Sequence, residues 1–239
     1  MKNKNFFYLQ YNKINWENQN KTKINEFVNN YIIKNIILKN QKKSLKIFDI
    51  GFGIGFFIKM LSIKLNGKYQ NIIIEGCEPS NKNYNNLINV KSKNNFHLKL
   101  HNDAFQDIHT NNKFDFITAI YVFPHFESDD LDRIAKKIRT MLEMGGKFIL
   151  VVAEEKYLKE KLKSKKDLFI EENTITFKGK KYKEFLHYSE IPEIGKVIDY
   201  NREENFYIDL FKKNNFILEK KTNLNDQGFI CTIFILKKQ

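Results

Sequence analysis

The chain has no long apolar run and no cysteine motif, and its first residues do not lead us to expect a secretory signal. No stretch of 18 or more apolar residues occurs, so the sequence predicts no helical membrane span. The only two cysteines, Cys77 and Cys231, lie inside apolar runs and form neither a CxxC motif nor a Cys/His pattern. We interpret them as buried thiols of a cytoplasmic protein. The polar start of the chain is not followed by an apolar region with a cleavage site, which argues against a secretory signal.

The net charge of +13 is unevenly distributed. Residues 1–46 contain 10 lysines and 2 glutamates, a net charge of +8, whereas residues 47–154 contain 13 basic and 12 acidic side chains. The whole chain is rich in Asn, Ile and Lys, so a solvated basic surface that results from composition is the favoured interpretation. A surface that binds a polyanion is the alternative. The hydrophobic content of 42% excludes a disordered chain.

Apolar periodicity predicts alternating helices and strands. Residues 22–38 have the pattern of an amphipathic helix, in which Phe27, Val28, Tyr31 and Ile32 share one face. The expected strands are 47–50, 72–77, 96–100, 114–122 and 147–153, and the expected helices between them are 55–66, 81–90 and 128–142. Ser128 is the expected N-cap of the last helix. This alternation predicts an α/β protein with a doubly wound, mostly parallel sheet.

The pattern changes after residue 154. The expected elements are a Lys/Glu-rich helix at 155–167, a β-hairpin at 168–188, a loop at 189–200 with Pro192 and Gly195, a helix at 202–213 and a terminal antiparallel strand pair. No linker separates two domains, so we expect one domain over residues 1–239. Its expected parts are an N-terminal helical cap (1–45), a core (46–154), an insertion (155–200) and a C-terminal helix with the strand pair (201–239).

Residues 48–55, Phe-Asp-Ile-Gly-Phe-Gly-Ile-Gly, are the most informative segment. A strand runs into Gly51, Gly53 and Gly55, and a helical pattern begins directly afterwards. Glycines let the backbone approach a ligand closely because no Cβ stands in the way. The N-terminus of the helix offers unpaired N–H groups to an anionic group. The segment therefore predicts a nucleotide-like cofactor.

Four further elements occur in order along the chain. They are Glu78-Pro79 after the second strand, Asp103-Ala104 after the third, the segment 114–125 and the segment 141–148. Together with the glycine segment, they resemble the class I S-adenosylmethionine-dependent methyltransferases over residues 45–154 and the C-terminal strand pair. The resemblance implies a seven-stranded, Rossmann-like methyltransferase sheet with an antiparallel C-terminal pair and a β-hairpin insertion. It also implies S-adenosylmethionine as the cofactor.

The resemblance implies roles for Asp49 of the first strand and for the three glycines that follow it. The methionine part of the cofactor lies against Gly51, Gly53 and Gly55, with its carboxylate near helix N–H groups. Asp49 orients this segment and reaches the methionine part directly or through water.

The resemblance implies further roles at the next strand ends. The two carboxylate oxygens of Glu78 suit the two ribose hydroxyls. Asp103 accepts from the adenine amino group, and the amide of Ala104 meets a ring nitrogen. Pro79 and Ile120 complete the expected cofactor-binding set.

Other interpretations share part of this pattern. A nicotinamide-dependent oxidoreductase also has a strand, glycines, a helix and a later acidic residue, but its G-x-G-x-x-G motif needs glycine where Phe56 stands. Taken singly, Asp49, Glu78 and Asp103 could be a turn cap, a solvated carboxylate and an Asx-turn residue. A cofactor-binding module without catalysis also stays open.

The resemblance implies an in-line methyl transfer, in which the protein positions the reactants and excludes water. A hydroxyl or protonated amine acceptor also needs a base. We expect His125 to be this base or an orienting residue, with Tyr121 beside the methyl position. His97 and His101 share a strand face but have no third ligand at a suitable spacing, so no metal site is predicted.

The segment after the fourth strand constrains the acceptor. Residues 121–125, Tyr-Val-Phe-Pro-His, differ from the Asn/Asp-Pro-Pro-aromatic element of enzymes that methylate amino groups of nucleic acids. The pattern is similar to the small-molecule branch, where the N-terminal cap and the insertion enclose the acceptor. The insertion residues that could line the acceptor site, or simply pack the hairpin, are Tyr182, Phe185, His187, Tyr188 and Tyr200. We predict a small organic acceptor, with an RNA or protein methyltransferase as the alternative. The sequence leaves the oligomeric state open.

Overall fold

A computed structural model of the chain describes residues 23–88, 95–164, 169–191, 195–226 and 228–239. Residue 22, the predicted start of the first helix, lies outside these ranges. The chain divides into two compact units, of which the first ends at Thr118 and the second begins at Ala119. This division falls inside strand β4 (Phe114–Ile120). The expectation of one domain over the whole chain stays a prediction.

The first unit contains alternating helices and parallel strands. Its elements are α3 (Lys23–Asn35), η1 (Ile37–Lys39), β1 (Ser44–Ile50), α4 (Phe56–Lys64), β2 (Asn71–Cys77), α5 (Asn81–Ile88), β3 (Phe96–His101), η2 (Phe105–Asp107) and most of β4. Strand β2 pairs in parallel with β1 on one side and with β3 on the other. The register places Asp49 opposite Gly76 and Ile50 opposite Cys77, so β1 and β2 end side by side.

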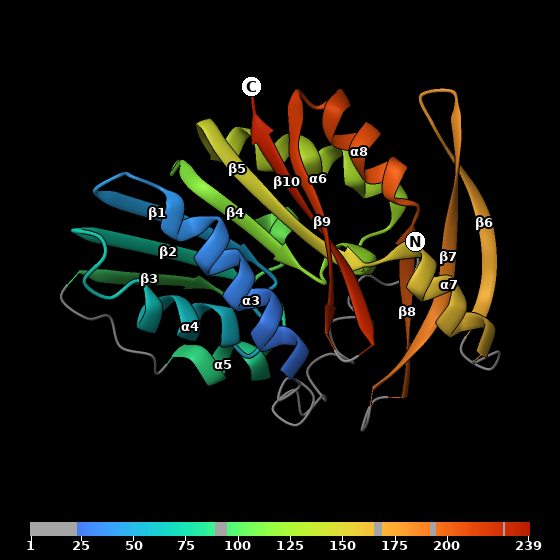
Figure 1. Ribbon diagram of the computed structural model, residues 1–239, viewed down its shortest axis with the longest axis horizontal. Helices are drawn as coiled ribbons and strands as arrows, with labels where there is room; N and C mark the ends of the chain where they lie inside the picture. The colour runs from blue at the N-terminus through green and yellow to red at the C-terminus, as the bar shows by residue number, and fades with distance from the viewer. Residues whose placement is uncertain (1–22, 89–94, 165–168, 192–194, 227) are drawn as a thin grey trace. The chain divides into compact units, whose positions relative to one another are not determined.

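The core of this unit is built from the short apolar runs of its strands. Ile47, Phe48 and Ile50 of β1 are fully or almost fully buried. Consecutive residues of the strand are buried because both faces are covered, as is usual for a parallel sheet. Helices α3 and α4 lie over the strands of this unit (Figure 1), and Leu61 of α4 is fully buried.

The buried face of α3 differs from the predicted one. Val28 and Ile32 are buried as expected, but Phe27 is 44% exposed and Ile33 is fully buried. The helix therefore presents residues 28, 29, 32 and 33 to the core, which is a stripe turned by about one residue from the predicted one. Several apolar residues on adjacent faces made both stripes compatible with the sequence.

The second unit contains the rest of the sheet and the insertion. Its elements are η3 (Phe123–His125), α6 (Ser128–Met141), β5 (Leu142–Ala153), α7 (Glu155–Ser164), β6 (Phe169–Phe177), β7 (Lys180–Ile191), β8 (Gly195–Arg202), α8 (Glu204–Lys213), β9 (Phe216–Asp226) and β10 (Phe229–Lys238). Strand β10 pairs antiparallel with both β5 and β9. Aromatic rings fill the core of this unit, and Phe148 lies 5.0 Å from Phe211 between ring centroids.

The seven-stranded sheet has the order β3-β2-β1-β4-β5-β10-β9. This order confirms the predicted α/β fold with a mostly parallel sheet and an antiparallel strand pair at the C-terminal end. None of the helices within the described residues combines the length and the apolar character needed to cross a bilayer.

The insertion forms a sheet of its own, with the order β6-β7-β8 (Figure 1). The predicted hairpin is confirmed, since β6 pairs antiparallel with β7 and Ile175 lies opposite Tyr182. The predicted loop at 189–200 is wrong, because β8 pairs with β7 and places Asp199 opposite His187. Val, Ile and Tyr at 197, 198 and 200 favour a strand, and this preference outweighs the turn residues Pro192 and Gly195 on which the loop prediction relied.

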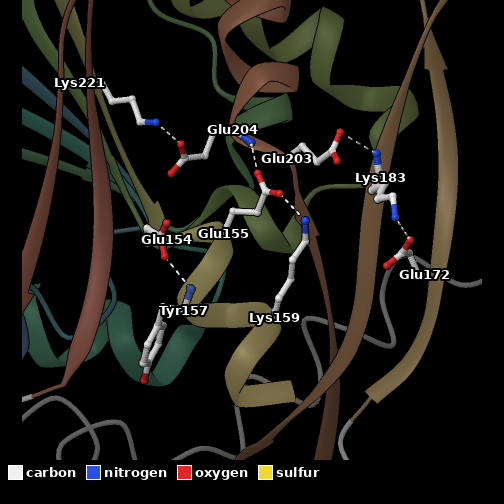
Figure 2. A network of polar contacts seen from close by, with 9 residues as sticks. All are labelled: Glu154, Glu155, Tyr157, Lys159, Glu172, Lys183, Glu203, Glu204 and Lys221. Carbon is white, nitrogen blue, oxygen red and sulfur yellow. Dashed lines mark hydrogen bonds and ion pairs between the residues drawn. The ribbon is translucent and has the colours of Figure 1, made fainter. Parts of the chain in front are cut away.

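Polar contacts bind the insertion to the C-terminal part of the second unit (Figure 2). Oε2 of Glu155 at the start of α7 accepts from the backbone N–H of Glu204 at 3.2 Å. Oε2 of Glu203 accepts from the backbone N–H of Lys183 in β7 at 3.1 Å. Glu204 is in turn paired with Lys221 of β9. These contacts fix α7 and β7 against α8, which also fixes the strand β8 that precedes α8.

Ser128 is not the N-cap of α6, contrary to prediction. The cap position is Glu127, and Ser128 is the first helical residue. The Ser128 hydroxyl instead donates to Oε1 of Glu184 at 2.5 Å and accepts from Nε of Arg202 at 2.8 Å. A serine near a helix start serves as a cap only when its backbone is extended, and here that conformation belongs to Glu127.

Candidate functional site

The glycine segment adopts the conformation that its composition requires. Gly51, Gly53 and Gly55 have φ values of 64°, 54° and 74°, in the region that other residues avoid. A Cβ on Gly53 would meet no atom within 4 Å, whereas a Cβ on Gly55 would lie 2.5 Å from Cδ1 of Leu87. Gly53 therefore leaves open space beside its backbone, and Gly55 allows α5 to pack closely behind the segment.

Glu78 connects the end of β2 to the glycine segment. Its side chain is only 5% exposed, its Oε2 accepts from the N–H of Gly53 at 2.9 Å, and its Oε1 accepts from the N–H of Ser80 at 3.0 Å. A carboxylate oxygen can accept more than one hydrogen bond, so a side chain of this kind can also bind hydroxyl donors. The sequence predicted Glu78 as a ligand for hydroxyl groups, and the structure adds its bond to the glycine segment.

Asp49 lies beneath the same segment, at the end of β1. It is 3% exposed, and its Oδ1 accepts from the hydroxyl of Thr118 at 2.6 Å. Burial raises the pKa of Asp49 to about 7, and the negative charge of Glu78 adds to the rise while the Thr118 hydrogen bond opposes it. Thr118 was missed by the sequence analysis because it lies in the middle of an apolar strand.

Asp103 and Ala104 come after β3, next to the end of β2. The side-chain amide of Asn102 donates to the carbonyl of Glu78 at 2.9 Å, and the N–H of Glu78 donates to the carbonyl of His101 at 3.0 Å. These bonds hold the two strand ends together, so the segment of Asp103 begins beside Glu78. Asp103 itself is exposed and Ala104 is half-buried.

The first unit thus brings together the predicted cofactor residues up to Ala104. Open backbone at Gly53, two carboxylate oxygens of Glu78 and an exposed carboxylate at Asp103 form a donor and acceptor set that suits a nucleoside linked to an amino acid. Pro79 is half-buried beside Glu78. His97 is exposed while His101 contacts Glu75 at 3.2 Å, so the two histidines do not act as a pair.

The second unit contains the remaining predicted site residues, Ile120, Tyr121 and His125. Ile120 is half-buried at the end of β4. Tyr121 has a φ of 59°, and its N–H donates to the carbonyl of Val151 at 3.0 Å. Its ring packs on Phe229 with 5.8 Å between centroids. Burial, together with the neighbouring Cys231, raises the pKa of the Tyr121 hydroxyl, which therefore stays protonated.

His125 ends the short helix η3 and contacts an aspartate of the insertion. Its Nδ1 lies 2.9 Å from Oδ1 of Asp199 in β8. Nε2 of His187 in β7 lies 3.9 Å from Oδ2 of the same carboxylate. Asp199 was missed by the sequence analysis because it lies far from His125 along the chain, in a segment predicted as a loop.

Part of the predicted acceptor set turns out to pack the insertion. Tyr182 is 5% exposed and donates its hydroxyl to Asp209, and Phe185 is buried against Leu158 and Leu162 of α7. His187, Tyr188 and Tyr200 are half-buried. Hairpin packing therefore explains two of the five residues, and the other three stay candidates for an acceptor site.

Comparison with known sequences agrees with this geometry. The profile of a methyltransferase domain family matches residues 23–204, which is more than half of the chain. The chain belongs to this methyltransferase family. A search of curated proteins gives no match.

Solved structures of methyltransferases have the same fold as this methyltransferase. The N-methyltransferase NodS from Bradyrhizobium japonicum WM9, in complex with S-adenosylhomocysteine, has a TM-score of 0.63 at 10% identity, with 98% of each chain covered. A S-adenosylmethionine-dependent methyltransferase from Clostridium acetobutylicum has a TM-score of 0.58 at 16% identity, covering 91% of this chain and 99% of that one. Magnesium protoporphyrin IX methyltransferase from Synechocystis PCC 6803, with bound S-adenosylmethionine, has a TM-score of 0.56 at 13% identity, covering 91% and 79%.

The enzyme is thus a class I methyltransferase that uses S-adenosylmethionine, as the sequence elements predicted. Within the part of the chain that the structure describes, no group of three or more His, Cys, Asp or Glu side chains is arranged to hold a metal ion.

Proposed function

We propose that the enzyme transfers the methyl group of S-adenosylmethionine to a small organic molecule. The observation that carries this proposal is the half-buried group of His125, Asp199 and His187, formed by η3 and the insertion sheet. A half-buried polar group on an insertion that also carries the half-buried rings of Tyr188 and Tyr200 suits a compact acceptor with apolar faces. The magnesium protoporphyrin IX methyltransferase of Synechocystis, which shares the fold, is named for a small-molecule acceptor.

We assign the cofactor to the first unit. Gly51, Gly53 and Gly55 receive the methionine part, and the ribose hydroxyls donate to Glu78 while its bond to Gly53 is kept. Asp103 and the amide of Ala104 take the adenine edge. The residues fit this cofactor, because Gly53 leaves open space and Glu78 has two carboxylate oxygens at the strand end.

In this proposal Asp49 supports the methionine part and Pro79 supplies apolar contact to the cofactor, while the role expected of Ile120 stays a prediction. Methyl transfer itself needs little chemistry from the protein beyond orientation and the exclusion of water. Cys77 and Cys231 are buried and form no disulfide, which agrees with a protein that works in a reducing compartment such as the cytoplasm.

The acceptor class can be tested with defined probes. The purified enzyme is mixed with S-adenosylmethionine and, in separate arms, with a panel of phenols, catechols and primary amines, with a single-stranded RNA, and with a Lys/Arg-rich peptide. Formation of S-adenosylhomocysteine is followed by mass spectrometry. We expect turnover with members of the small-molecule panel and none with RNA or peptide.

The basic N-terminal segment supplies the control. A variant without residues 1–20 is expected to keep its turnover of small molecules, because the proposal gives the positive charge no part in acceptor binding. Turnover of RNA, with RNA affinity that falls steeply as salt increases and is lost in the shortened variant, would replace the small-molecule proposal with an RNA methyltransferase.

A further inference from the structure

Asp199 lies between two histidines that come from two other elements. Its Oδ1 is 2.9 Å from Nδ1 of His125 at the end of η3, and its Oδ2 is 3.9 Å from Nε2 of His187 in β7. The Asp199 side chain is 13% exposed and the His125 side chain 28% exposed. The carboxylate is therefore withdrawn from solvent, while His125 retains access to it.

The ring of His187 is oriented by a neighbour on β8. Nδ2 of Asn201 donates to Nδ1 of His187 at 3.0 Å, so the proton of the neutral ring is on Nε2, which faces Asp199. Burial lowers the pKa of His187, although the charge of Asp199 opposes this effect. Burial therefore favours the neutral form of His187, which offers an N–H rather than a positive charge beside the carboxylate.

The backbone that carries His125 is fixed by a buried arginine from the same strand as Asp199. The guanidinium of Arg202 donates to the carbonyl of Phe126 at 2.7 Å and to that of Phe123 at 3.5 Å. Its charge is balanced by Glu184 of β7 at 2.8 Å. Because Asp199 and Arg202 lie on one strand, β8 sets both the position of η3 and the orientation of the ring at its end.

The short distance between His125 and Asp199 bears on which ring nitrogen of His125 carries the proton. A nitrogen lone pair and a carboxylate oxygen at 2.9 Å repel each other, so this contact favours a proton on Nδ1 of His125, although Oδ1 does not meet the angular requirement for a hydrogen bond in this conformation. In the neutral ring, Nε2 is then the basic nitrogen. This is the arrangement in which a carboxylate sets the tautomer of a histidine base.

We propose that Asp199 is a positioning residue that keeps the His125 proton on Nδ1, so that Nε2 takes a proton from the methyl acceptor. The proposal rests on the proposed function and narrows it to acceptors whose nucleophile is a hydroxyl or a protonated amine. In the reaction, the acceptor proton moves to Nε2, and the acceptor lone pair forms the bond to the methyl carbon. The electron pair of the breaking carbon–sulfur bond stays on sulfur, and Asp199 stabilises the resulting imidazolium.

The tautomer of His125 can be measured without knowing the acceptor. The protein is labelled with ¹⁵N-histidine and studied without ligand by long-range ¹H–¹⁵N correlation at about pH 8, above the ordinary pKa of histidine. His125 is assigned from the spectrum of His125→Gln. We expect the Nδ1–H tautomer in the unmodified protein, and a change to mainly Nε2–H in Asp199→Ala.

A matched control is Asp209→Ala, which removes another aspartate that accepts hydrogen bonds in the second unit. It is expected to leave the His125 tautomer unchanged. If Asp199→Ala does not fold, the spectrum of the unmodified protein still decides: a dominant Nε2–H tautomer, or a fully protonated ring, would overturn the proposal. An unchanged tautomer in a folded Asp199→Ala variant would overturn it as well.

Activity gives a second readout that a structural role would not produce. With any panel compound that is turned over, we expect Asp199→Asn to lower kcat by about 100-fold and to leave KM within about threefold. Titration of the same variant with S-adenosylhomocysteine should give the affinity of the unmodified protein. If the unmodified protein does not bind S-adenosylhomocysteine, the proposed function is contradicted. The tautomer measurement is unaffected, because it is made on the protein without ligand.

Discussion

The strand ends of the first unit, where we propose that the cofactor binds, and the group of His125, Asp199 and His187 in the second unit are built in different ways. In the first unit, Asp49, Glu78 and Asp103 lie at or just after strand ends, and Glu78 accepts from the backbone N–H groups of Gly53 and Ser80. In the second unit, His125 and Asp199 come from distant segments and meet side chain to side chain. The first arrangement is encoded in short contiguous motifs, whereas the second depends on how an insertion folds.

The largest effect is expected where the second unit depends on a buried charge pair. Arg202→Met removes the partner of Glu184, whose side chain is 7% exposed, and also removes the donors to the carbonyls of η3. We expect a loss of about 4 kcal/mol in the free energy of unfolding, measured by urea denaturation.

The double variant Arg202→Met/Glu184→Leu separates the charge from the other contacts. It should recover part of the loss, because no unpaired carboxylate is then left buried. A double variant that is no more stable than the single variant would mean that the Glu184 charge is not the cause.

The next largest effect is expected at Gly55, which is compared with Gly53 of the same segment. Gly55→Ala places a Cβ 2.5 Å from Leu87, which is fully buried, at a φ of 74°. We expect a loss of about 3 kcal/mol in unfolding free energy, from the backbone conformation and from overpacking.

Gly53→Ala is the matched variant, because its φ is also positive but its Cβ would meet no atom within 4 Å. It should cost about 1 kcal/mol in stability and should act mainly on cofactor affinity. Equal losses of stability in the two variants would contradict the role given to Leu87.

A smaller effect depends on pH and comes from Asp49. Its pKa is about 7 in the folded protein and 3.8 in the reference state, so the folded protein binds the additional proton between these values. The contribution of Asp49 to the stability of the cofactor-free protein is therefore greatest below this range and falls as pH rises from about 4 to about 7.

Asp49→Asn does not titrate and can still accept from Thr118. The free energy of unfolding of each protein is measured by urea denaturation at pH 5 and pH 8. The value for Asp49→Asn minus the value for the unmodified protein should be about 2 kcal/mol larger at pH 8 than at pH 5. If the two proteins differ in unfolding free energy by the same amount at pH 5 and at pH 8, the pKa of Asp49 is not raised in the folded protein.

The two regions also differ in how far the sequence predicts them. The succession of strands and helices, and the places of Glu78 and Asp103 at strand ends, were predictable from motifs in which a strand, a turn and a helix lie next to one another. Asp199 could not be found in this way. The turn residues Pro192 and Gly195 led to the prediction of a loop where β8 lies, and its partner His125 is on another element. Ser128 shows the same limit, since its two side-chain partners lie on β7 and β8.

The central claim is that the buried carboxylate of Glu78, at the glycine segment, binds the cofactor. Its most direct test is calorimetric titration with S-adenosylhomocysteine of the unmodified protein, Glu78→Ala and His125→Ala, each first shown to be folded by circular dichroism. Two lost charge-assisted hydrogen bonds predict binding about 100-fold weaker in Glu78→Ala, while His125→Ala should stay within about twofold of the unmodified protein. Unchanged affinity in Glu78→Ala would contradict the account.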